Sequence, residues 1–351
     1  MRPANVSICK GFKMNVSVCF NQVPRKLLKG EVRDRISEAG AEKEARAVKA
    51  ALRQLGHEVK LVPLGADAPA FAEALRAAQP EVVFNLCEGF WGDSRKELHV
   101  AALFDLLGLA YTGSAPLCLG LTQDKARTKD LLAAHNLPTP RYVLVKLGEH
   151  FPKTKNLSYP LMVKPRFEDA SLGITAESIV DDEKALTKRI AYVHETYRQG
   201  ALIEEFIDGR ELNVAVLGNA PMEVLPVSEI VFKPGLKRAI VSYDGKWLED
   251  SQEYAQTEPL CPATLKAKEL LLVRDVALRA CKLLDCRDYA RVDIRLRDGV
   301  PYILELNANP DLSPDAGLAR SAQAAGIGYP RLVERILQLA LKRQESLHAK
   351  P

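Results

Sequence analysis

Two carboxylates, an amide and an arginine alternate along two neighbouring strand-like segments late in the chain. Arg291 and Asp293 stand two residues apart in the first segment, and Glu305 and Asn307 stand two apart in the second. Side chains two apart on a strand project from the same face, so each pair projects together. Mg²⁺ takes oxygen ligands and commonly joins carboxylates to substrate phosphates. Asp293, Glu305 and Asn307 are therefore candidate metal ligands, with Arg291 on the same patch.

The pairing register of this hairpin decides whether the two pairs meet. A tight Asp-Gly turn at 298–299 would place Asp293 opposite Leu304 and split the carboxylates between two faces. A three-residue or bulged turn would place Asp293 opposite Glu305 and gather the apolar residues on the other face. Register follows the buried face, so we predict the second pairing. The plainer alternative is a solvated face on which Arg291 simply pairs with Asp293.

Two lysines stand at positions that suit a phosphate. Lys164 ends an apolar strand-like run, and Lys125 opens a predicted helix. The loop after Lys164 contains Ser171 and Gly173 and could cover phosphates with its backbone N–H groups. Each lysine taken alone is more often a solvated surface residue. The chain has neither a Walker A sequence nor a G-x-G-x-x-G run, so a P-loop or a dinucleotide Rossmann site is not expected.

An apolar strand-like run that carries two acids follows in the middle of the chain. Glu204, Glu205, Phe206 and Ile207 lie in this run. It resembles a linker that reads adenine through backbone groups and a carboxylate, so these four residues are candidate nucleotide contacts. Glu211, on the next predicted strand, could reach ribose hydroxyls.

Composition and charge are those of an ordinary globular protein. The chain has 351 residues, of which 47% are apolar, and this length suggests about two or three domains. A net charge of +4 without a Lys/Arg block gives no reason to expect nucleic acid or a membrane surface as a partner. No run approaches roughly 18 apolar residues, so no membrane span is predicted. Seven scattered cysteines without a C-x-x-C pair favour reduced thiols in the cytoplasm.

Hydrophobic periodicity predicts a change of architecture along the chain. Strand-like and helix-like segments alternate in the first third, which is typical of βαβ units and a parallel α/β sheet. Mixed helices and antiparallel strands of the α+β kind are expected after that, so we place domains at 1–120, 121–204 and 205–351. Residues 1–13 lack the apolar stretch of a signal peptide, and a start at Met14 would make them a dispensable, disordered arm.

The expected secondary structure can be given by residue ranges. The expected strands are 15–20, 58–64, 81–86, 110–112, 141–145, 161–164, 201–206, 211–217, 223–232, 289–297 and 302–307. The expected helices are 42–54, 70–78, 97–107, 124–135, 181–199 and 264–284, with two more from Pro314 and Pro330. The strands that carry the candidate site residues therefore belong mainly to the second and third predicted domains.

Taken together, these motifs resemble the ATP-grasp superfamily, closest to the D-alanine–D-alanine ligases. Any single motif is weak, but six in a common order and spacing are specific. The resemblance runs from about residue 80 to the end of the chain. The segments that carry it are Thr122–Thr128, Pro160–Pro165, Glu168–Gly173, Leu202–Leu212, Tyr289–Asp293 and Leu304–Asn307.

The resemblance implies an N-terminal parallel α/β domain followed by two α+β domains that clamp ATP. It assigns Lys125 and Lys164 to the phosphates, Glu204 to the adenine side and Glu211 to the ribose. Lys246 resembles a further γ-phosphate lysine of the family. A homodimer formed through the N-terminal domain is usual in the family.

The resemblance also implies a metal site and a covering loop. Asp293, Glu305 and Asn307 would hold Mg²⁺, usually two ions, with Mn²⁺ as an alternative. Arg291 would stabilise the oxyanion that develops during the reaction. Ser171 would lie in a loop that closes over the site.

The substrate half of the sequence departs from the ligase pattern near its beginning. The family follows its first strand with a Gly-Gly loop and a glutamate that binds the first amino group, and this chain lacks both. Glu31, Glu38 or Glu42 could substitute for that glutamate. Glu88 and the glycine after it replace the usual His-Gly pair and could line the first-substrate pocket.

The loop after Asn307 and the covering loop also differ from the family pattern. Asp311 stands where the family has a glycine, and Ala316 stands where it has a serine that grips the acceptor carboxylate. In the covering loop, 169–170 reads Asp-Ala where Gly-Ser is usual. Two acids, Asp311 and Asp315, are unfavourable near a site that should receive a carboxylate. They suggest an acceptor that lacks a free carboxylate or carries an extra amine.

We therefore expect an ATP-dependent, ADP-forming carboxylate–amine ligase that works through an acyl phosphate on small molecules. Its substrates are a carboxylate, such as an amino acid, and an amine acceptor, and they differ from two D-alanines. One alternative is a genuine D-alanine–D-alanine ligase of cell-wall synthesis. Another is a small-molecule kinase on the same scaffold, and a third is an inactive nucleotide-binding module. The intact set of Lys164, Arg291, Asp293, Glu305 and Asn307 argues against the third.

Overall fold

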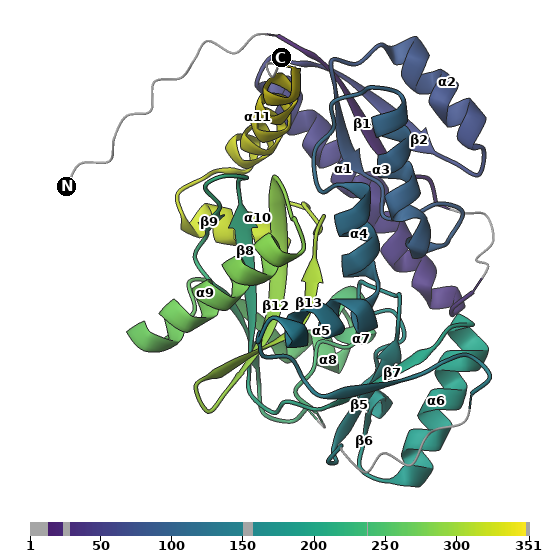
Figure 1. Ribbon diagram of the computed structural model, residues 1–351, viewed down its shortest axis with the longest axis vertical. Helices are drawn as coiled ribbons and strands as arrows, with labels where there is room; N and C mark the ends of the chain where they lie inside the picture. Colours follow the sequence, from purple (N-terminus) through teal and green to yellow (C-terminus); the bar gives the residue numbers. More distant parts are fainter. Residues whose placement is uncertain (1–12, 24–28, 150–156, 237, 349–351) are drawn as a thin grey trace.

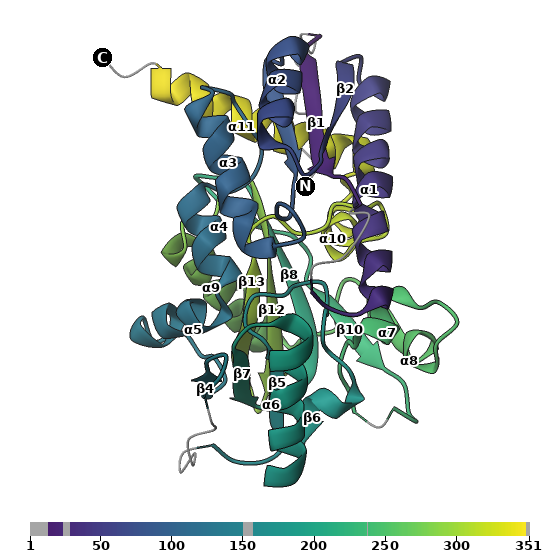
Figure 2. The ribbon, with the colours of Figure 1, turned by 90° about the vertical axis from the view of Figure 1, so that its right-hand side faces the viewer.

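The computed structural model describes residues 13–23, 29–149, 157–236 and 238–348 and arranges them as three sheets with flanking helices (Figure 1). Most of the expected N-terminal arm, residues 1–12, lies outside the described residues. In Figure 2 the N-terminal sheet is at the top, the largest sheet is in the middle, and the four-stranded sheet is below. The parallel sheet comes first in the chain and the antiparallel sheets follow, as the sequence predicts.

The N-terminal sheet is parallel, with strand order β2-β1-β3. Helices cover both of its faces, which is usual for parallel sheets. One face packs on α1 and α11, and the other packs on α2 and α3. Its elements are β1 (Asn15–Asn21), α1 (Arg35–Gln54), β2 (Glu58–Leu64), α2 (Ala68–Ala78), β3 (Val82–Leu86), α3 (Glu97–Leu106) and α11 (Tyr329–His348).

Two predictions for this region are corrected by the structure. Tyr111 forms only an isolated parallel bridge with Val83, so residues 110–112 are not a full strand. Helix α1 begins at Arg35 and not at Glu42. The apolar periodicity that predicted this helix starts only at Ala45, so its first turns carry no such signal.

The four-stranded sheet is antiparallel, with order β4-β7-β5-β6. Helix α6 covers one face and packs on Val163 and Ile203, which are fully buried. Because side chains alternate along a strand, Lys164 and Glu204 project from the opposite face. Its elements are β4 (Tyr142–Val145), β5 (Leu161–Pro165), β6 (Ile179–Val180), α6 (Glu183–Tyr197) and β7 (Ala201–Glu205).

The six-stranded sheet has the order β11-β10-β8-β12-β13, and β9 pairs with the end of β8. All of its pairs are antiparallel, and α9 packs across β8, β12 and β13. The predicted strand 223–232 is interrupted, because β9 and β10 pair with opposite ends of β8. The elements are β8 (Arg210–Leu217), β9 (Glu223–Val224), β10 (Ser228–Phe232), β11 (Thr257–Leu260), α9 (Ala267–Leu283), β12 (Tyr289–Arg297) and β13 (Val300–Asn307).

Short helices connect the sheets, and several of them have no counterpart in the sequence prediction. They are η1 (Val32–Asp34), η2 (Ser94–Lys96), α4 (Pro116–Gln123), α5 (Lys125–Ala134), η3 (Ala176–Ser178), α7 (Tyr243–Trp247), α8 (Gln252–Ala255) and α10 (Gly317–Ala324). The unpredicted ones are η1, η2, α4, η3, α7 and α8. Within the described residues, no helix combines the length and the apolar character needed to cross a bilayer.

The β12–β13 hairpin has the predicted pairing for a different reason. Asp293 lies opposite Glu305, but the turn is tight, with Arg297 opposite Val300. The shift comes from a bulge between Asp293 and Ile294, where Leu304 is the extra residue. The bulge reverses the alternation of side chains beyond it. Ile303 is therefore buried in the core, and Leu304 lines the cavity described below, which corrects the predicted apolar face.

A buried carboxylate ties the N-terminal region to the large sheet. Asp288 is fully buried and accepts hydrogen bonds from the Gly113 backbone (2.8 Å) and the Asn219 amide (3.0 Å). It also forms an ion pair with Arg343 of α11. These contacts join three separate parts of the fold through one side chain.

Asp288→Asn is expected to lower the free energy of unfolding by about 3 kcal/mol, because it leaves Arg343 without its buried anion. Asparagine keeps the left-handed backbone that Asp288 adopts at φ 64°. Asp298→Asn is the matched control, since Asp298 has φ 52° but its side chain is 93% exposed. Denaturant unfolding of both variants measures the difference, and equal losses would contradict the assignment.

Candidate active site

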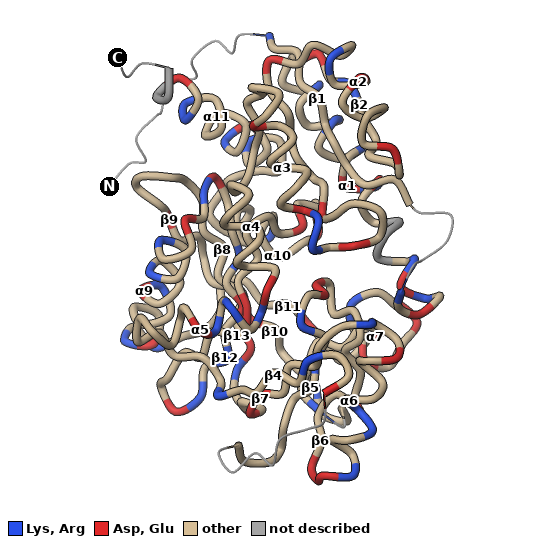
Figure 3. The backbone as a smooth tube through the Cα atoms, turned by 45° about the vertical axis from the view of Figure 1, so that its right-hand side comes forward, with Lys and Arg blue, Asp and Glu red and all other residues tan. Residues whose placement is uncertain are grey.

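A cavity of about 730 Å³ lies where elements of all three sheets meet. Strands β5 and β7, the β12–β13 hairpin, α7 and the loop after β3 all contribute to its wall. Sixteen of the candidate site residues from the sequence line it: Glu88, Lys125, Lys164, Ser171, Glu204, Glu205, Phe206, Ile207, Glu211, Lys246, Arg291, Asp293, Glu305, Asn307, Asp311 and Asp315. Figure 3 shows acidic and basic segments close together around β12 and β13.

The candidate metal ligands form one hydrogen-bonded group. Arg291 donates two hydrogen bonds to Asp293, from Nε to Oδ1 (2.7 Å) and from Nη2 to Oδ2 (2.8 Å). The amides of Asn307 (3.0 Å) and Asn213 (2.7 Å) also donate to Asp293. Arg291 thus pairs with Asp293, as the plainer alternative has it, but Asp293 is buried and the patch lines the cavity instead of an open face.

Glu305 completes this group and is surrounded by cations. Its carboxylate lies 3.5 Å from Lys125 Nζ. Burial alone would raise its pKa, but Lys125, Lys164, Arg291 and Lys246 lower the pKa to about 2. The side chain is therefore ionised at neutral pH and available as an anionic ligand.

The donor set fits a hard divalent cation that is shared with a nucleotide. In the described part of the chain no three His, Cys, Asp or Glu side chains gather into a metal site of their own. Two carboxylates and one amide supply only part of an oxygen shell. Mg²⁺ is usually held in this way, by one or two carboxylates together with substrate phosphates and water.

Two lysines share one buried carboxylate on the four-stranded sheet. Glu204 lies 2.7 Å from Lys164 Nζ and 2.8 Å from Lys129 Nζ. The pKa of Lys129 falls to about 8, because burial and the charge of Lys164 outweigh its attraction to Glu204. The sequence analysis missed Lys129, although its i, i+4 spacing from Lys125 places both lysines on one face of α5.

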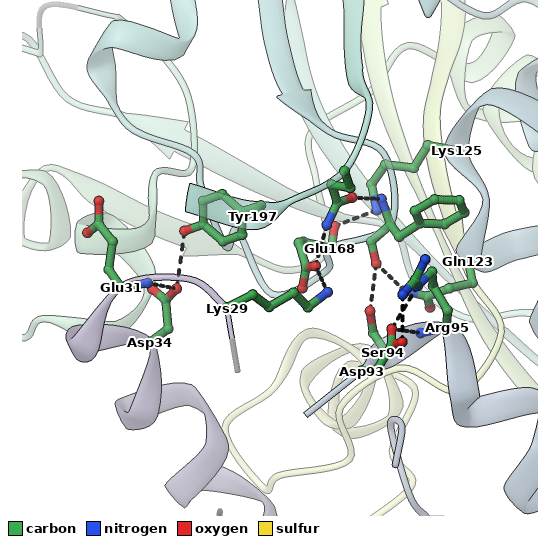
Figure 4. A network of polar contacts seen from close by, with 12 residues as sticks. Lys29, Glu31, Asp34, Asp93, Ser94, Arg95, Gln123, Lys125, Glu168 and Tyr197 are labelled. Atoms are coloured by element: carbon green, nitrogen blue, oxygen red, sulfur yellow. Dashed lines mark hydrogen bonds and ion pairs between the residues drawn. The ribbon is translucent and has the colours of Figure 1, made fainter. Parts of the chain in front are cut away.

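A polar network connects the N-terminal segment to Lys125 (Figure 4). Lys125 Nζ donates to the carbonyl of Glu168 (2.7 Å) and to Asp169 Oδ1 (2.6 Å). The Glu168 side chain accepts hydrogen bonds from Lys29 and from Gln199 Nε2 (2.5 Å). Lys29 precedes α1 in the chain, so the N-terminal region contacts the side chain of the residue whose carbonyl orients Lys125.

The loop that contains Ser171 packs against α7. Ser171 Oγ donates to the carbonyl of Val241 (3.0 Å), and Trp247 Nε1 donates to the carbonyl of Ala170 (2.9 Å). Ala170 and Ser171 both adopt left-handed backbone, with φ of 53° and 61°. Lys246 lies over the Trp247 ring, 5.1 Å from its centroid, and burial together with Arg291 lowers the pKa of Lys246.

At the expected nucleotide end of the cavity, two acids form ion pairs with arginines that the sequence analysis did not single out. Glu205 pairs with Arg141 (2.6 Å), and Glu211 pairs with Arg295. Arg295 also lies 5.4 Å from the Phe206 ring centroid. The Glu211 carboxylate is therefore bound on one side, which limits the predicted ribose contact to its remaining lone pairs.

The substrate half of the cavity is acidic, but the residues differ partly from those predicted. Glu31 hydrogen-bonds with Tyr192, and Glu42 pairs with Arg46 on the surface, so neither lines the cavity. The side chain of the third candidate, Glu38, lies outside the described residues. Glu44 lines the cavity instead. An acid on the apolar stripe of α1, four residues before Val48, is the sequence signal for it.

Two further residues of this half were also missed. Arg320 lines the cavity and donates from Nη2 to the carbonyl of Asp315 (2.8 Å). Asn309 accepts a hydrogen bond from the Ser114 backbone (2.9 Å), and Gly113 must be glycine because a Cβ would lie 2.4 Å from Asn309 Oδ1. The N-terminal region thus closes tightly over the loop that follows β13.

Comparison with known proteins agrees with this geometry. A family model described as the C-terminus of D-ala D-ala ligase matches residues 131–338. The D-alanine–D-alanine ligase of Pseudothermotoga lettingae is 34% identical over 292 residues, which are 83% of this chain and 91% of the relative. The chain belongs to the D-alanine–D-alanine ligase family. It is therefore an ATP-grasp ligase of the class that forms carbon–nitrogen bonds, as the resemblance implied.

One further relative and one solved structure are also similar. An uncharacterized protein of Sinorhizobium fredii is 38% identical over 308 residues, which are 85% of this chain and 88% of that protein. The structure of D-alanine–D-alanine ligase from Bacillus anthracis complexed with ATP has a TM-score of 0.75 and 24% identity, over 95% of this chain and 99% of that one. The structural likeness confirms the predicted ATP-grasp fold.

The low pKa of Lys129 makes stability depend on pH in a defined window. The folded value is about 8, and an unfolded lysine has a pKa of about 10.4. Between these values the unfolded chain binds more protons, so stability rises with pH. Lys129→Met removes this titration. We therefore expect the wild type to gain stability relative to Lys129→Met as the pH rises from 8 to 10, by at most about 1.4 kcal/mol of unfolding free energy per pH unit.

Denaturant unfolding at pH 7, 8, 9 and 10 measures this difference. Lys188→Met is the control, because Lys188 is exposed on α6. A flat difference for Lys129→Met over the same range would show that Lys129 stays charged in the folded protein.

Lys29→Met is expected to raise the KM for ATP about three- to tenfold, with a smaller effect on kcat. The variant releases Glu168, whose backbone carbonyl orients Lys125. Steady-state ADP release at varied ATP measures the change, again with Lys188→Met as control. An unchanged KM would mean that the N-terminal contact does not influence the phosphate end of the cavity.

Proposed function

We propose that the chain is an ATP-dependent, ADP-forming carboxylate–amine ligase whose substrates differ from two D-alanines. The observation that carries the proposal is the convergence of one cation set and one oxygen-donor set on a single cavity. Lys125 and Lys164 lie on its central side, and Arg291 with Asp293 and Glu305 lies on the hairpin. Family membership supports the reaction class, and the acidic substrate half supports the difference in substrates.

The proposed reaction has two balanced steps. A carboxylate oxygen of the first substrate attacks the γ-phosphorus of ATP, and ADP leaves with the electrons of the broken P–O bond. The amine of the second substrate then attacks the acyl carbon of the resulting acyl phosphate. Inorganic phosphate leaves, and the new amide loses a proton to solvent. Each step accumulates negative charge, so fixed cations contribute more than a strong base.

The chain's own residues have distinct roles in this proposal. Lys125 and Lys164 bind phosphate oxygens, and Arg291 stabilises the oxyanion at the acyl carbon. Asp293, Glu305 and Asn307 would hold Mg²⁺, which when bound neutralises phosphate charge and orients the transferred group. Lys246 binds the γ-phosphate, and the Ser171 loop excludes water that would hydrolyse the acyl phosphate.

The proposal also covers the contacts to the adenosine part of ATP and the cellular compartment. Glu204 to Ile207 face the adenine, and Glu211 faces the ribose. The six described cysteines are free thiols, which supports a cytoplasmic setting. The three domain ranges and the homodimer stay predictions.

A genuine D-alanine–D-alanine ligase is the second candidate function, favoured by relatives that carry this name. Arg320 is the observation in its favour, because it could hold an acceptor carboxylate in place of the missing serine. A kinase would be distinguished from both by a phosphorylated product, and an inactive module by the absence of any product.

The test is ADP release with Mg-ATP against D- and L-amino acids, singly and in pairs, with products identified by mass spectrometry. We expect an amide product and free phosphate only when an amine acceptor is present. Glu305→Gln should lower the rate at least about 100-fold, because it removes an anionic ligand of the phosphate-bound metal. Glu73→Gln, exposed on α2, should leave the rate unchanged.

The possible results separate the candidates. D-alanyl-D-alanine as the best product would establish the second candidate. A phosphorylated product without an amide would establish a kinase. No ADP release under any condition, with nucleotide binding unaffected by Glu305→Gln, would overturn the proposal.

A further inference from the structure

We propose that Tyr243 is a positioning residue that ties α7 to residues 29–34 and thereby keeps water away from the acyl phosphate. We call residues 29–34, which include η1 and lead into α1, the N-terminal strap. Helix α7 contains Lys246 and packs against the Ser171 loop, so a contact that holds this helix also holds both of them. The inference rests on the proposed ligase function and adds the means by which its cavity stays closed.

The N-terminal strap is held against α6 by two side chains of that helix. The Tyr192 hydroxyl donates a hydrogen bond to Glu31 Oε1 (2.7 Å), and the Tyr197 hydroxyl donates one to Asp34 Oδ2 (3.1 Å). Figure 4 shows the second contact together with the Lys29 side chain of the strap. Because α6 packs on the four-stranded sheet, these contacts fix the strap relative to that sheet.

Arg33 and Tyr243 join the strap to α7. The Tyr243 hydroxyl donates a hydrogen bond to the carbonyl of Arg33 (2.7 Å), and Arg33 Nη1 donates one to Asp244 Oδ1 (2.8 Å). Tyr243 is only 1% exposed, whereas the side chains of Arg33 and Asp244 are 32% and 31% exposed. A partly exposed ion pair contributes little by itself. The hydroxyl of the buried tyrosine is therefore the principal link between the strap and α7.

Helix α7 is connected in turn to the Ser171 loop. The backbone N–H of Tyr243 donates a hydrogen bond to the carbonyl of Ile174, just after this loop (2.9 Å). It adds to the two hydrogen bonds described above between the loop and the region of α7. Lys246 lies three residues after Tyr243 on the same short helix and lines the cavity. One residue therefore links the strap to the loop and to the helix that contains the lysine.

Helix α6 holds the other side of the Ser171 loop. Arg189 of α6 donates hydrogen bonds to the carbonyl of Gly173 and to Ser178 Oγ (2.7 Å). The strap, α6, the Ser171 loop and α7 thus form a closed ring of contacts. Because the ring joins segments that are far apart in the chain, loss of one link lets the loop and α7 open more often while the sheets stay folded.

Opening of this ring has a chemical consequence in the proposed reaction. Water that reaches the acyl phosphate competes with the amine for the acyl carbon. Its oxygen forms a new bond to that carbon, the bond from the carbon to the phosphate oxygen breaks, and a proton goes to solvent. The first substrate regains its carboxylate, and inorganic phosphate is released. One ATP is then consumed without an amide, so ADP is formed in excess of product.

The experiment measures this excess ADP on the full-length enzyme with Mg-ATP and a substrate pair that yields an amide. Tyr243→Phe removes the hydroxyl and keeps the ring, and Arg33→Gln weakens the same link from the strap. Tyr302→Phe is the matched control for the first variant, because Tyr302 lies near the turn of the β12–β13 hairpin and does not line the cavity. Arg53→Gln is the control for the second, because Arg53 is exposed on α1.

Hydrogen exchange with Mg-ADP bound gives a second readout that does not need turnover. We expect Tyr243→Phe to raise the excess ADP about fivefold, as the loss of one hydrogen bond in the closed state would give. Backbone amides of residues 168–174 and 241–247 should exchange faster by a similar factor, while those of α9 keep their rates. Both controls should behave as the wild type. A general loss of stability would instead speed exchange in α9 as well.

The two readouts separate this inference from the ligase function. Unchanged excess ADP in Tyr243→Phe, or faster exchange that extends to α9, would overturn the inference and leave the ligase function intact. Arg33→Gln decides in its place if Tyr243→Phe folds poorly. If no substrate pair releases ADP, that result counts against the ligase function. Exchange then decides the inference: faster exchange confined to the two segments supports it, and unchanged exchange overturns it.

Discussion

Two buried carboxylates in this protein, Glu204 and Asp288, are neutralised by cations carried on other elements, and this requirement constrains how the elements meet. Glu204 joins Lys164 of β5 to Lys129 of α5. Asp288 binds Arg343 of the last helix. A buried charge that loses its partner costs several kcal/mol, so each pair resists any other arrangement of the elements. These ion pairs therefore help to fix where the cavity lies. They also leave its phosphate side electropositive, because two lysines face the single carboxylate of Glu204 there.

The same physical rule explains why the two halves of the cavity differ. In the nucleotide half, each acid has a cation or an amide against it, and Glu305 stays ionised. In the substrate half, Glu44 has only a backbone N–H, and burial with neighbouring acids disfavours its ionised form. The first half is organised before any ligand arrives.

The sequence predicts the parts of the site that depend on local spacing. Alternation along β12 and β13 places Arg291 with Asp293 and Glu305 with Asn307, and the structure confirms their meeting. It does not predict the bulge at Leu304, because the extra residue depends on which side chain the core accepts. The predicted pairing was correct, but the bulge that produces it lies within the strands and not at the turn, where a three-residue or bulged connection was predicted.

What the sequence does not predict are contacts between distant segments. Lys129 and Arg295 are ordinary charged residues until tertiary packing buries them beside Glu204 and Glu211. Glu44 carries a signal, an acid on an apolar helix face, but periodicity alone cannot say whether such a residue faces a cavity or a partner. The family resemblance supplied roles for the nucleotide half and none for these residues.

Helix α11 has a consequence for how the chain reaches its final form. Leu332, Val333, Ile336 and Leu337 are fully buried, and they complete the core on the α1 side of the N-terminal sheet. The first sheet to be synthesised therefore waits for one of the last helices. During translation α1 alone covers that face, and the part of β3 that packs on α11 stays exposed until α11 has been synthesised. A nascent chain of this protein would therefore depend on chaperones for longer than its early βαβ pattern suggests.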